Sequence, residues 1–223
     1  ISDGGNARGA VNYLTGRYML TGRNESETLQ VLAVNNVTHM LLSQSDVAKY
    51  STFSYVGSNE DLDRFSIVDI FLSERSLGYV EDNVTHIVFQ GAGLVDYDMV
   101  IDGEYFPKFE TYVMNVIVPV EGDEEGNVLE WRQPEAMVYY NGKTRRVKMD
   151  CLFHDGVKYE YEGEDLLEGC LYLMPWINEN KAVPEGAAMF FSKSAKESTF
   201  SRLYLFEEEF DNFELVYSDE DVD

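Results

Sequence analysis

Apolar positions change their spacing along the chain, from helical intervals in the first third to alternate residues afterwards. Between residues 10 and 20 apolar side chains recur with a helical period, and a second such stripe covers residues 25–34. Residues 37–42 indicate a short buried strand. Residues 61–74 are apolar densely enough to predict another, largely buried helix. The first third is therefore predicted to be mainly helical.

Beyond about residue 78 the pattern is typical of β-strands. Asn141-Gly142 is the clearest hairpin turn, and the Asp-Gly pairs at 102–103 and 155–156 predict two more. The strands that the pattern predicts cover residues 85–89, 99–101, 110–120, 128–131, 136–140, 145–153, 157–161, 170–174, 187–191, 201–206 and 213–217.

These patterns predict an α+β fold. In it, a helix-rich N-terminal core of about residues 1–77 packs against a β-rich remainder, about residues 78–217, of mostly antiparallel strands. No linker is long enough to require two folding units, so residues 1–223 are expected to form a single domain. Hydrophobic residues make up 44% of the chain, which is typical of a globular protein.

The charge balance is strongly acidic. Lys and Arg number 17 against 41 Asp and Glu, a formal net charge of −24. This argues against nucleic acid as a partner, because phosphate binding needs clustered cations. No run of 18 apolar residues occurs, so no membrane span is predicted. Since the chain opens at Ile1 without an initiator Met or a signal peptide, we interpret it as part of a longer protein.

Histidine and cysteine give little sign of a metal centre. His39, His86 and His154 lie far apart, and none has a second His or Cys at ligand spacing, so structural histidines are expected. Cys151 and Cys170 are the two cysteines. A disulfide between them would add about 3 kcal/mol of stability, and an extracytoplasmic or hyperthermophile setting would permit it. The sequence leaves the bridged and the free states open.

Three Asn-x-Ser/Thr sequons begin at Asn24, Asn36 and Asn83. Such tripeptides are frequent by chance. On a protein outside the cytoplasm each of the three would be a candidate N-glycosylation site.

Residues 46–53, DVAKYSTF, are the most informative segment. Asp46, Lys49 and Phe53 follow the spacing i, i+3 and i+7, which places them on one face of a helix. Ser45 is expected to be the N-cap and Gly57 the stop. Judged by spacing alone, Asp46 and Lys49 form an ordinary surface ion pair worth about 0.2–0.5 kcal/mol.

The segment DVAKYSTF also resembles the DK motif, Asp-x-x-Lys-x-x-x-hydrophobic, of the catalytic subunit of oligosaccharyltransferases, in particular the archaeal AglB type. The context is similar too. Asp-Gly-Gly at residues 3–5 resembles the stretch after that family's WWDYG motif, and an Asn-Glu pair follows at 24–25. The resemblance covers roughly the first 60 residues, and it departs at Phe53, where the family usually has Ile or Met.

This resemblance implies a C-terminal soluble domain of a multi-pass membrane enzyme, located at the extracytoplasmic face of the cell membrane. The enzyme would transfer an oligosaccharide from a lipid carrier to the Asn of Asn-x-Ser/Thr in an acceptor polypeptide. Asp46, Lys49 and Phe53 would contribute to recognition of the sequon. No catalytic or metal-binding residue is assigned to this chain. A divalent cation, manganese or magnesium, and the lipid-linked oligosaccharide are expected to bind in the missing membrane region, so the isolated chain should be inactive.

Two other classes of function remain open. The chain could be a non-enzymatic acidic extracytoplasmic binding module for sugar or protein, and its 15 tyrosines are compatible with a recognition surface. A hydrolase from a halophile is favoured by the acidity alone.

Overall fold

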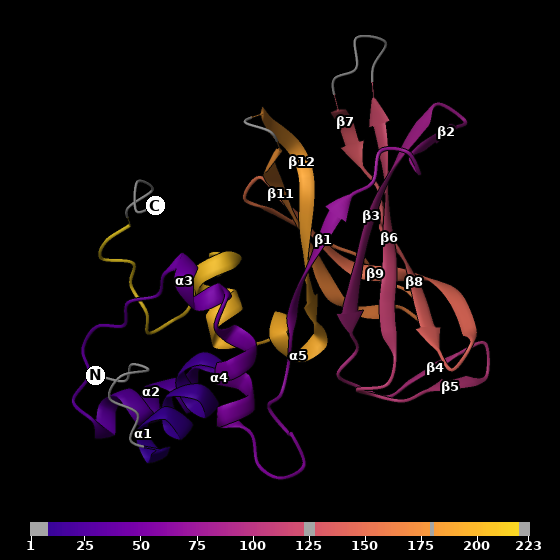
Figure 1. Ribbon diagram of the computed structural model, residues 1–223. Helices are drawn as coiled ribbons and strands as arrows, with labels where there is room; N and C mark the ends of the chain where they lie inside the picture. Colours follow the sequence, from indigo (N-terminus) through magenta and orange to yellow (C-terminus); the bar gives the residue numbers. More distant parts are fainter. Residues whose placement is uncertain (1–8, 123–127, 179–180, 219–223) are drawn as a thin grey trace.

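Seven strands pair into a closed β-barrel. The computed structural model describes residues 9–122, 128–178 and 181–218. Each strand of the barrel pairs with the next, and the last one pairs with the first (Figure 1). In ring order the strands are β1 (Val68–Ser73), β3 (Val84–Leu94), β6 (Tyr112–Gly122), β8 (Glu135–Tyr140), β9 (Lys143–His154), β11 (Leu167–Asn178) and β12 (Lys181–Ser192).

Neighbouring strands of the barrel are antiparallel except for β9 and β11, which are parallel. A ring with an odd number of strands cannot alternate in direction all the way round, so at least one parallel pair is unavoidable. The chain reaches β11 after β10 (Val157–Glu160), which first folds back along β9. The connection through β10 therefore makes the closure geometrically possible.

Four further short strands extend or cover the barrel. β2 (Tyr79–Glu81) pairs with β3, and β7 (Val128–Trp131) pairs with β6. β4 (Met99–Ile101) and β5 (Glu104–Phe106) form a separate hairpin. Their buried residues belong to the barrel core, so this hairpin closes one end of the barrel.

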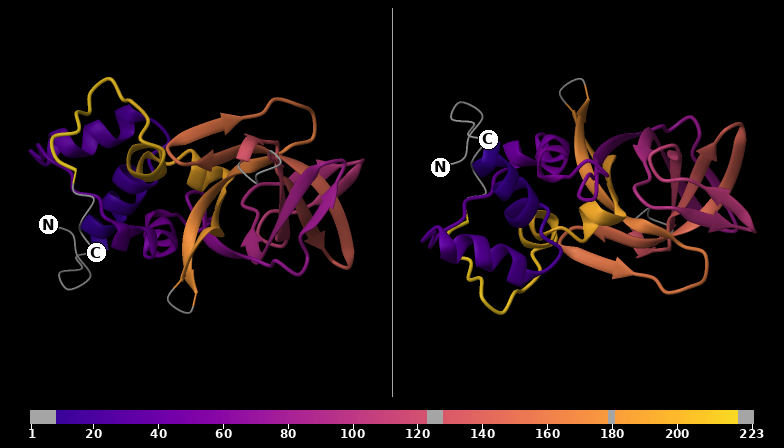
Figure 2. Two further views of the ribbon diagram at one scale, coloured as in Figure 1. Left: turned by 90° about the horizontal axis from the view of Figure 1, so that it is seen from above. Right: turned by 90° about the horizontal axis from the view of Figure 1, so that it is seen from below.

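The helices gather beside the barrel, at one end of the molecule (Figure 2). α1 (Gly9–Leu14) continues directly into η1 (Thr15–Leu20), a π-helical turn. The other helices are α2 (Glu25–Val34), α3 (Gln44–Val47), α4 (Tyr50–Gly57), α5 (Lys193–Lys196) and a second π-helical turn, η2 (Ser201–Leu205). In the described part of the chain every helix is too short or too polar to cross a membrane.

Buried apolar side chains form two clusters. The larger cluster fills the barrel, and the smaller one lies between the helices and the outer face of β9, β11 and β12. On β9, for example, Leu152 belongs to the interior cluster, whereas Cys151 and Phe153 belong to the outer one. Where both faces of these strands are buried, at residues 151–153, 170–174 and 187–191, the sequence is continuously apolar rather than alternating.

The predicted α+β fold with a helix-rich N-terminal core at about residues 1–77 is wrong. The protein is mainly β, and its principal core is the interior of the barrel. Within the described residues of the first four helices and η1, the buried hydrophobic side chains are Leu20, Leu32 and Tyr50. The helices therefore add a layer to the barrel and do not form a core of their own.

The predicted helix at residues 61–74 is also wrong, because Val68–Ser73 form strand β1. Phe71 is fully buried, while Ile70 and Leu72 are 56% and 43% exposed. That alternation is the mark of a strand with one face on the core. The sequence shows dense apolar residues here, and this density suits a helix equally well.

Three predicted strands are absent from the described structure. Residues 37–42 are extended but pair with no strand, and Leu41 is 86% exposed. Residues 201–206 contain η2 instead, and residues 213–217 form neither helix nor strand. These segments have the composition of strands, but among the described residues no strand pairs with them, and composition alone does not make a strand.

The remaining local predictions are largely confirmed. α2 has the predicted bounds, Glu25–Val34, and β4 and β7 also begin and end where expected. At the hairpin between β8 and β9, Asn141 and Gly142 have φ values of 46° and 79°. The predicted Asp-Gly turns at 102–103 and 155–156 have the same left-handed pattern, as tight hairpins require.

Candidate functional site

The segment with the Asp-x-x-Lys pattern forms two short helices, α3 and α4, that meet at Ala48 and Lys49. The first begins one residue after Ser43, whose backbone N–H and hydroxyl both donate to Oδ2 of Asp46, at 3.0 and 2.9 Å. Ser43 is therefore the N-cap, not Ser45 as predicted. Asp46 closes the first turn, where a carboxylate also suits the helix dipole.

Lys49 lies on the exposed surface of the segment. Its ammonium nitrogen is 3.5 Å from the hydroxyl oxygen of Ser45, a weak contact. The ion pairs of the described residues do not include one between Asp46 and Lys49, whose carboxylate and ammonium would make the predicted surface pair. Asp46 is committed to the turn, and the charge of Lys49 is presented to solvent.

Phe53 is half-buried, and it packs against the cluster between the helices and the barrel. The buried face of α4 also contains Tyr50, Ser54 and Gly57. The exposed residues nearest to Lys49 by helical spacing are Thr52 and Val56, at i+3 and i+7. The structure thus separates the three predicted residues by role: Asp46 caps, Lys49 is exposed and Phe53 is packed.

Buried hydroxyl groups attach α4 to the rest of the protein. The hydroxyls of Tyr50 and Ser66 lie 3.0 Å apart, and the Ser54 hydroxyl donates to the backbone oxygen of Ser66 at 2.7 Å. Burial raises the pKa of Tyr50 to about 12, and its ring stacks on that of Phe200 at 5.5 Å. A buried hydroxyl pays for its desolvation only when it is hydrogen-bonded, so these contacts specify one position for α4.

Two arginine–carboxylate pairs join separate segments of the helical layer. The Arg17 guanidinium binds both carboxylate oxygens of Asp63, at 3.0 and 2.6 Å. Arg64, which is 8% exposed, binds Glu27 in the same bidentate way, at 3.0 and 3.1 Å. Sequence reasoning missed these pairs, because their members lie dozens of positions apart and no local pattern joins them.

We expect the Arg17–Asp63 pair to contribute to the acid stability of the protein. The hydrogen bonds from Arg17 hold the pKa of Asp63 at about 2, below its ordinary value. A depressed pKa stabilises the folded state above the unfolded-state pKa, and that stabilisation disappears as the pH falls toward 2. Because both side chains are partly exposed, the contribution should be about 1 kcal/mol.

Chemical unfolding measured at pH 4 and at pH 2.5 tests this. The free energy of unfolding should fall less between these two pH values in Asp63→Asn than in the wild type. An Asp61→Asn variant, changed at an exposed site in the same loop, should behave like the wild type; equal pH dependence in all three proteins would contradict the prediction.

The two cysteines are joined in the structure by a disulfide between adjacent strands, Cys151 on β9 and Cys170 on β11.

Of the three sequon asparagines, Asn24 is the N-cap of α2, and its side chain accepts a hydrogen bond from the Glu27 N–H at 3.0 Å. Asn36 follows the end of α2, and Asn83 lies in the turn between β2 and β3; both are exposed, with φ values of 52° and 64°. Whether any of them carries a glycan stays a prediction.

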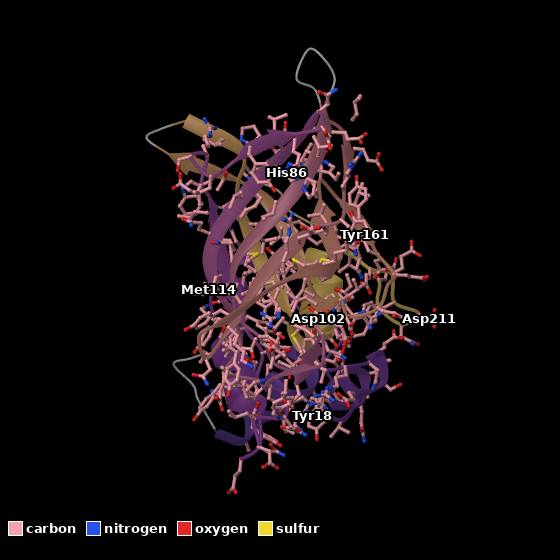
Figure 3. All side chains as sticks on the ribbon, turned by 90° about the vertical axis from the view of Figure 1, so that its right-hand side faces the viewer. Tyr18, His86, Asp102, Met114, Tyr161 and Asp211 are labelled. Carbon is pink, nitrogen blue, oxygen red and sulfur yellow. A yellow bond between two sulfur atoms is a disulfide. The ribbon has the colours of Figure 1, made fainter. Side chains whose placement is uncertain are left out.

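The histidines remain apart in space. His39 precedes α3 in the chain, His86 lies on β3 far from the helical end that Tyr18 marks, and His154 ends β9 (Figure 3). Within residues 9–122, 128–178 and 181–218, no three His, Cys, Asp or Glu side chains form a group that could hold a metal ion. The Asp-Gly-Gly sequence at residues 3–5 lies outside the described residues.

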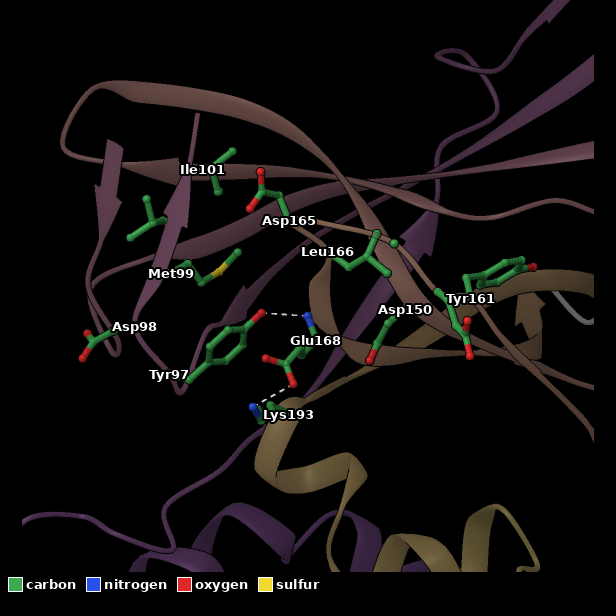
Figure 4. Close-up of a pocket in the computed structure, with 13 residues that line it drawn as sticks. Tyr97, Asp98, Met99, Ile101, Asp150, Tyr161, Asp165, Leu166, Glu168 and Lys193 are labelled. Carbon is green, nitrogen blue, oxygen red and sulfur yellow. Dashed lines mark hydrogen bonds and ion pairs between the residues drawn. The ribbon is translucent and has the colours of Figure 1, made fainter. Parts of the chain in front are cut away.

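A cavity of about 750 Å³ lies at the barrel, and Tyr97, Asp150 and Glu168 are among the residues that line it (Figure 4). The carboxylate of Glu168 forms an ion pair with the ammonium group of Lys193 at 2.7 Å. The backbone N–H of Glu168 donates to the hydroxyl of Tyr97, also at 2.7 Å. Burial raises the pKa of Tyr97. The described residues that line the cavity, which include Asp98, Asp150, Glu162 and Asp165, do not include Asp46, Lys49 or Phe53. Sequence reasoning did not predict this cavity, because its residues come from β4, β9, β11, α5 and the loops beside them.

Asp96 is a buried carboxylate near that cavity. It is 9% exposed, and its Oδ2 accepts a hydrogen bond from the backbone N–H of Ser194 at 3.0 Å. Its other oxygen has no hydrogen-bond partner among the described residues, and burial raises the pKa of the group. A raised pKa means that this carboxylate destabilises the folded state at neutral pH.

Comparison with known proteins gives one distant likeness. No protein-family model matches the chain, and no curated protein matches its sequence. Among solved structures, the C-terminal domain of PglB from C. jejuni is similar with a TM-score of 0.42 and 11% sequence identity. The alignment covers 96% of this chain and 81% of that one. A likeness of this size is too weak to locate a site or to indicate an activity.

Proposed function

We propose that this chain is the C-terminal domain of an oligosaccharyltransferase catalytic subunit and that α4 contributes to recognition of the acceptor sequon. The proposal rests on the DVAKYSTF pattern at residues 46–53. The observation that carries it is the placement of this pattern where α3 meets the anchored helix α4, with Lys49 on the surface and Phe53 packed behind it.

The chemistry of this surface suits the hydroxyl residue of Asn-x-Ser/Thr. A hydroxyl oxygen can accept a hydrogen bond from an ammonium group, and Lys49 offers one that is not paired with Asp46. The methyl group of Thr favours an apolar wall. Val56 is 38% exposed on α4, about two turns after Lys49, and the half-buried Phe53 lies between them in the sequence. A polar donor next to an apolar surface discriminates a hydroxyl-bearing residue from one that lacks the hydroxyl.

The chemical step is proposed to take place elsewhere in a longer protein. The amide nitrogen of Asn is a weak nucleophile, and the groups that activate it would belong to a membrane region together with manganese or magnesium. That region would also bind the lipid-linked oligosaccharide. This chain would stand at the extracytoplasmic face of the membrane, where its acceptor polypeptide arrives.

Replacing Lys49 or Phe53 with alanine in the full-length enzyme should weaken transfer to an acceptor peptide. A hydrogen bond to a charged group contributes about 1.5–3 kcal/mol, so Lys49→Ala should lower kcat/KM by about ten- to a hundredfold. The change should fall mainly on the KM for the peptide, because the catalytic groups are untouched. The measurement is steady-state transfer to a sequon peptide, with circular dichroism to confirm folding.

The matched control is Lys143→Ala, which removes an exposed lysine at the β8–β9 hairpin. Its transfer kinetics should equal those of the wild type. Unchanged kinetics in both Lys49→Ala and Phe53→Ala would contradict the proposal. So would measurable transfer by residues 1–223 alone, since the catalytic groups are proposed to lie outside them.

A non-enzymatic binding module is the second candidate, and the acidic cavity around Glu168 favours it. The coding sequence upstream of Ile1 distinguishes the two candidates. Several membrane spans that end in a WWDYG-like motif would support the transferase, whereas a signal peptide alone would support the module.

A further inference from the structure

Helix α4 touches η1 backbone against backbone at two glycines. A Cβ atom placed on Gly16 would lie 2.5 Å from the carbonyl oxygen of Phe53, and one placed on Gly57 would lie 2.5 Å from the backbone nitrogen of Arg17. Real Cβ atoms essentially never approach other atoms within 3.0 Å. Because the obstructing atoms belong to the backbone, no side-chain rotation could make room for a methyl group.

The π-helical turn holds its side of this contact firmly. The backbone N–H and the hydroxyl of Thr21 both donate to the carbonyl oxygen of Gly16, each at 2.9 Å. Such turns are rare, and they occur frequently at functional sites. Gly16 therefore cannot retreat from Phe53 without loss of two buried hydrogen bonds.

Arg17, the residue after Gly16, binds the C-terminal end of α4. Nη1 of Arg17 donates to the carbonyl oxygen of Gly57 at 3.1 Å, while the guanidinium also binds Asp63. A carbonyl at a helix end lacks an intrahelical partner, so this bond acts as a cap. Gly16 and Arg17 together thus fix α4 at Phe53 and at Gly57.

We infer that Gly16 and Gly57 are positioning residues for the recognition helix and set where Lys49 and Phe53 stand relative to the acceptor. The backbone oxygen of Phe53 is the contact point, and the N–H of Phe53 donates to the carbonyl oxygen of Lys49 at 3.0 Å. A displacement at Gly16 is therefore passed to Lys49 through one turn of helix. This inference rests on the proposed function of α4.

The test is Gly16→Ala in the 223-residue chain and in the full-length enzyme. In the chain, the amide chemical shifts of residues 49 and 53 should change, while those of the barrel strands stay in place. In the enzyme, the KM for acceptor peptide should rise about ten- to a hundredfold while kcat changes little, as expected for a misplaced contact. The matched control is Gly9→Ala, since a Cβ atom at Gly9 would meet nothing within 4 Å and should leave both measurements unchanged.

A second variant keeps the test decisive if Gly16→Ala does not fold. Arg17→Met removes the bond to Gly57 without adding bulk at the crossing, and it should shift the amide signals of residues 53 and 57. A folded Gly16→Ala chain with unchanged signals at residues 49 and 53 would overturn the inference, and so would an unchanged signal at residue 53 in Arg17→Met. Changed signals with an unchanged KM would uphold the positioning of α4 and contradict the proposed function instead.

Discussion

Replacing Phe71 with alanine should lower the free energy of unfolding by about 3–5 kcal/mol, the usual cost of deleting a buried aromatic ring. The ring is fully buried, and it meets that of Phe190 at a centroid distance of 6.2 Å. It also occupies the space left by two glycines of β3. Cβ atoms on Gly91 and Gly93 would lie 2.6 and 3.2 Å from it. Because glycines have no side chain that could fill the cavity, the loss should be near the upper end.

The matched control is Ile70→Ala, one position earlier on β1, where the side chain is 56% exposed. It should cost less than about 1 kcal/mol. Thermal unfolding provides the comparison: the Phe71 variant should unfold about 6 to 20 °C below the wild type, and the Ile70 variant close to it. Equal losses at the two positions would mean that both side chains are buried, as in the helix that the sequence predicted, and would contradict strand β1.

Removing the disulfide with Cys151→Ala and Cys170→Ala together should lower the free energy of unfolding by about 3 kcal/mol. The bridge spans 19 positions, and the stabilisation comes in the chain-entropy account from a restricted unfolded state. Both cysteines are fully buried between the barrel and the helices. The bridge also joins β9 to β11, which form the parallel pair of the barrel. We therefore expect closure of the barrel to be less stable without it.

Alkylation of the unfolded protein, with and without reductant, establishes whether the bridge is present. A reductant should then lower the midpoint temperature of thermal unfolding of the wild type but not that of the double-alanine variant. Two thiols that react in the non-reduced unfolded chain would contradict the disulfide. Because Cys151 and Cys170 are inaccessible in the folded state, reduction should follow the unfolding rate.

Signals that act within about ten residues predicted most of the strands correctly. Alternation of apolar side chains reveals a strand wherever one face is buried, and Asn141-Gly142 favours left-handed φ values whatever surrounds it. The start of the candidate site at Asp46 was also predicted from neighbouring residues alone. A helix at residues 46–57 was predicted from the sequence. The structure has two helices there, α3 and α4, and the carboxylate of Asp46 closes the first turn of α3, at Ser43 instead of Ser45.

Contacts between distant segments determined the features that were predicted wrongly. Residues 68–73 are apolar enough for either a helix or a strand, and they become β1 because β12 and β3 offer edges on both sides. Residues 213–217 have a similar composition, but no described strand pairs with them and they form no strand. A propensity that suits two structures is decided by the available partner.

In the candidate site, too, some features follow from the local sequence and others from tertiary contacts. The composition and spacing of DVAKYSTF predict a helical segment with a lysine and a phenylalanine at defined intervals, and the structure divides that segment into α3 and α4. That Phe53 is packed while Lys49 is exposed depends on which face of α4 meets the barrel. The position of α4 depends on Gly16 and Arg17, which come long before it in the chain, and on Asp63, which binds Arg17. Hydrogen bonds and turns between near neighbours are encoded locally. Close packing requires surfaces that meet only after the whole chain has folded.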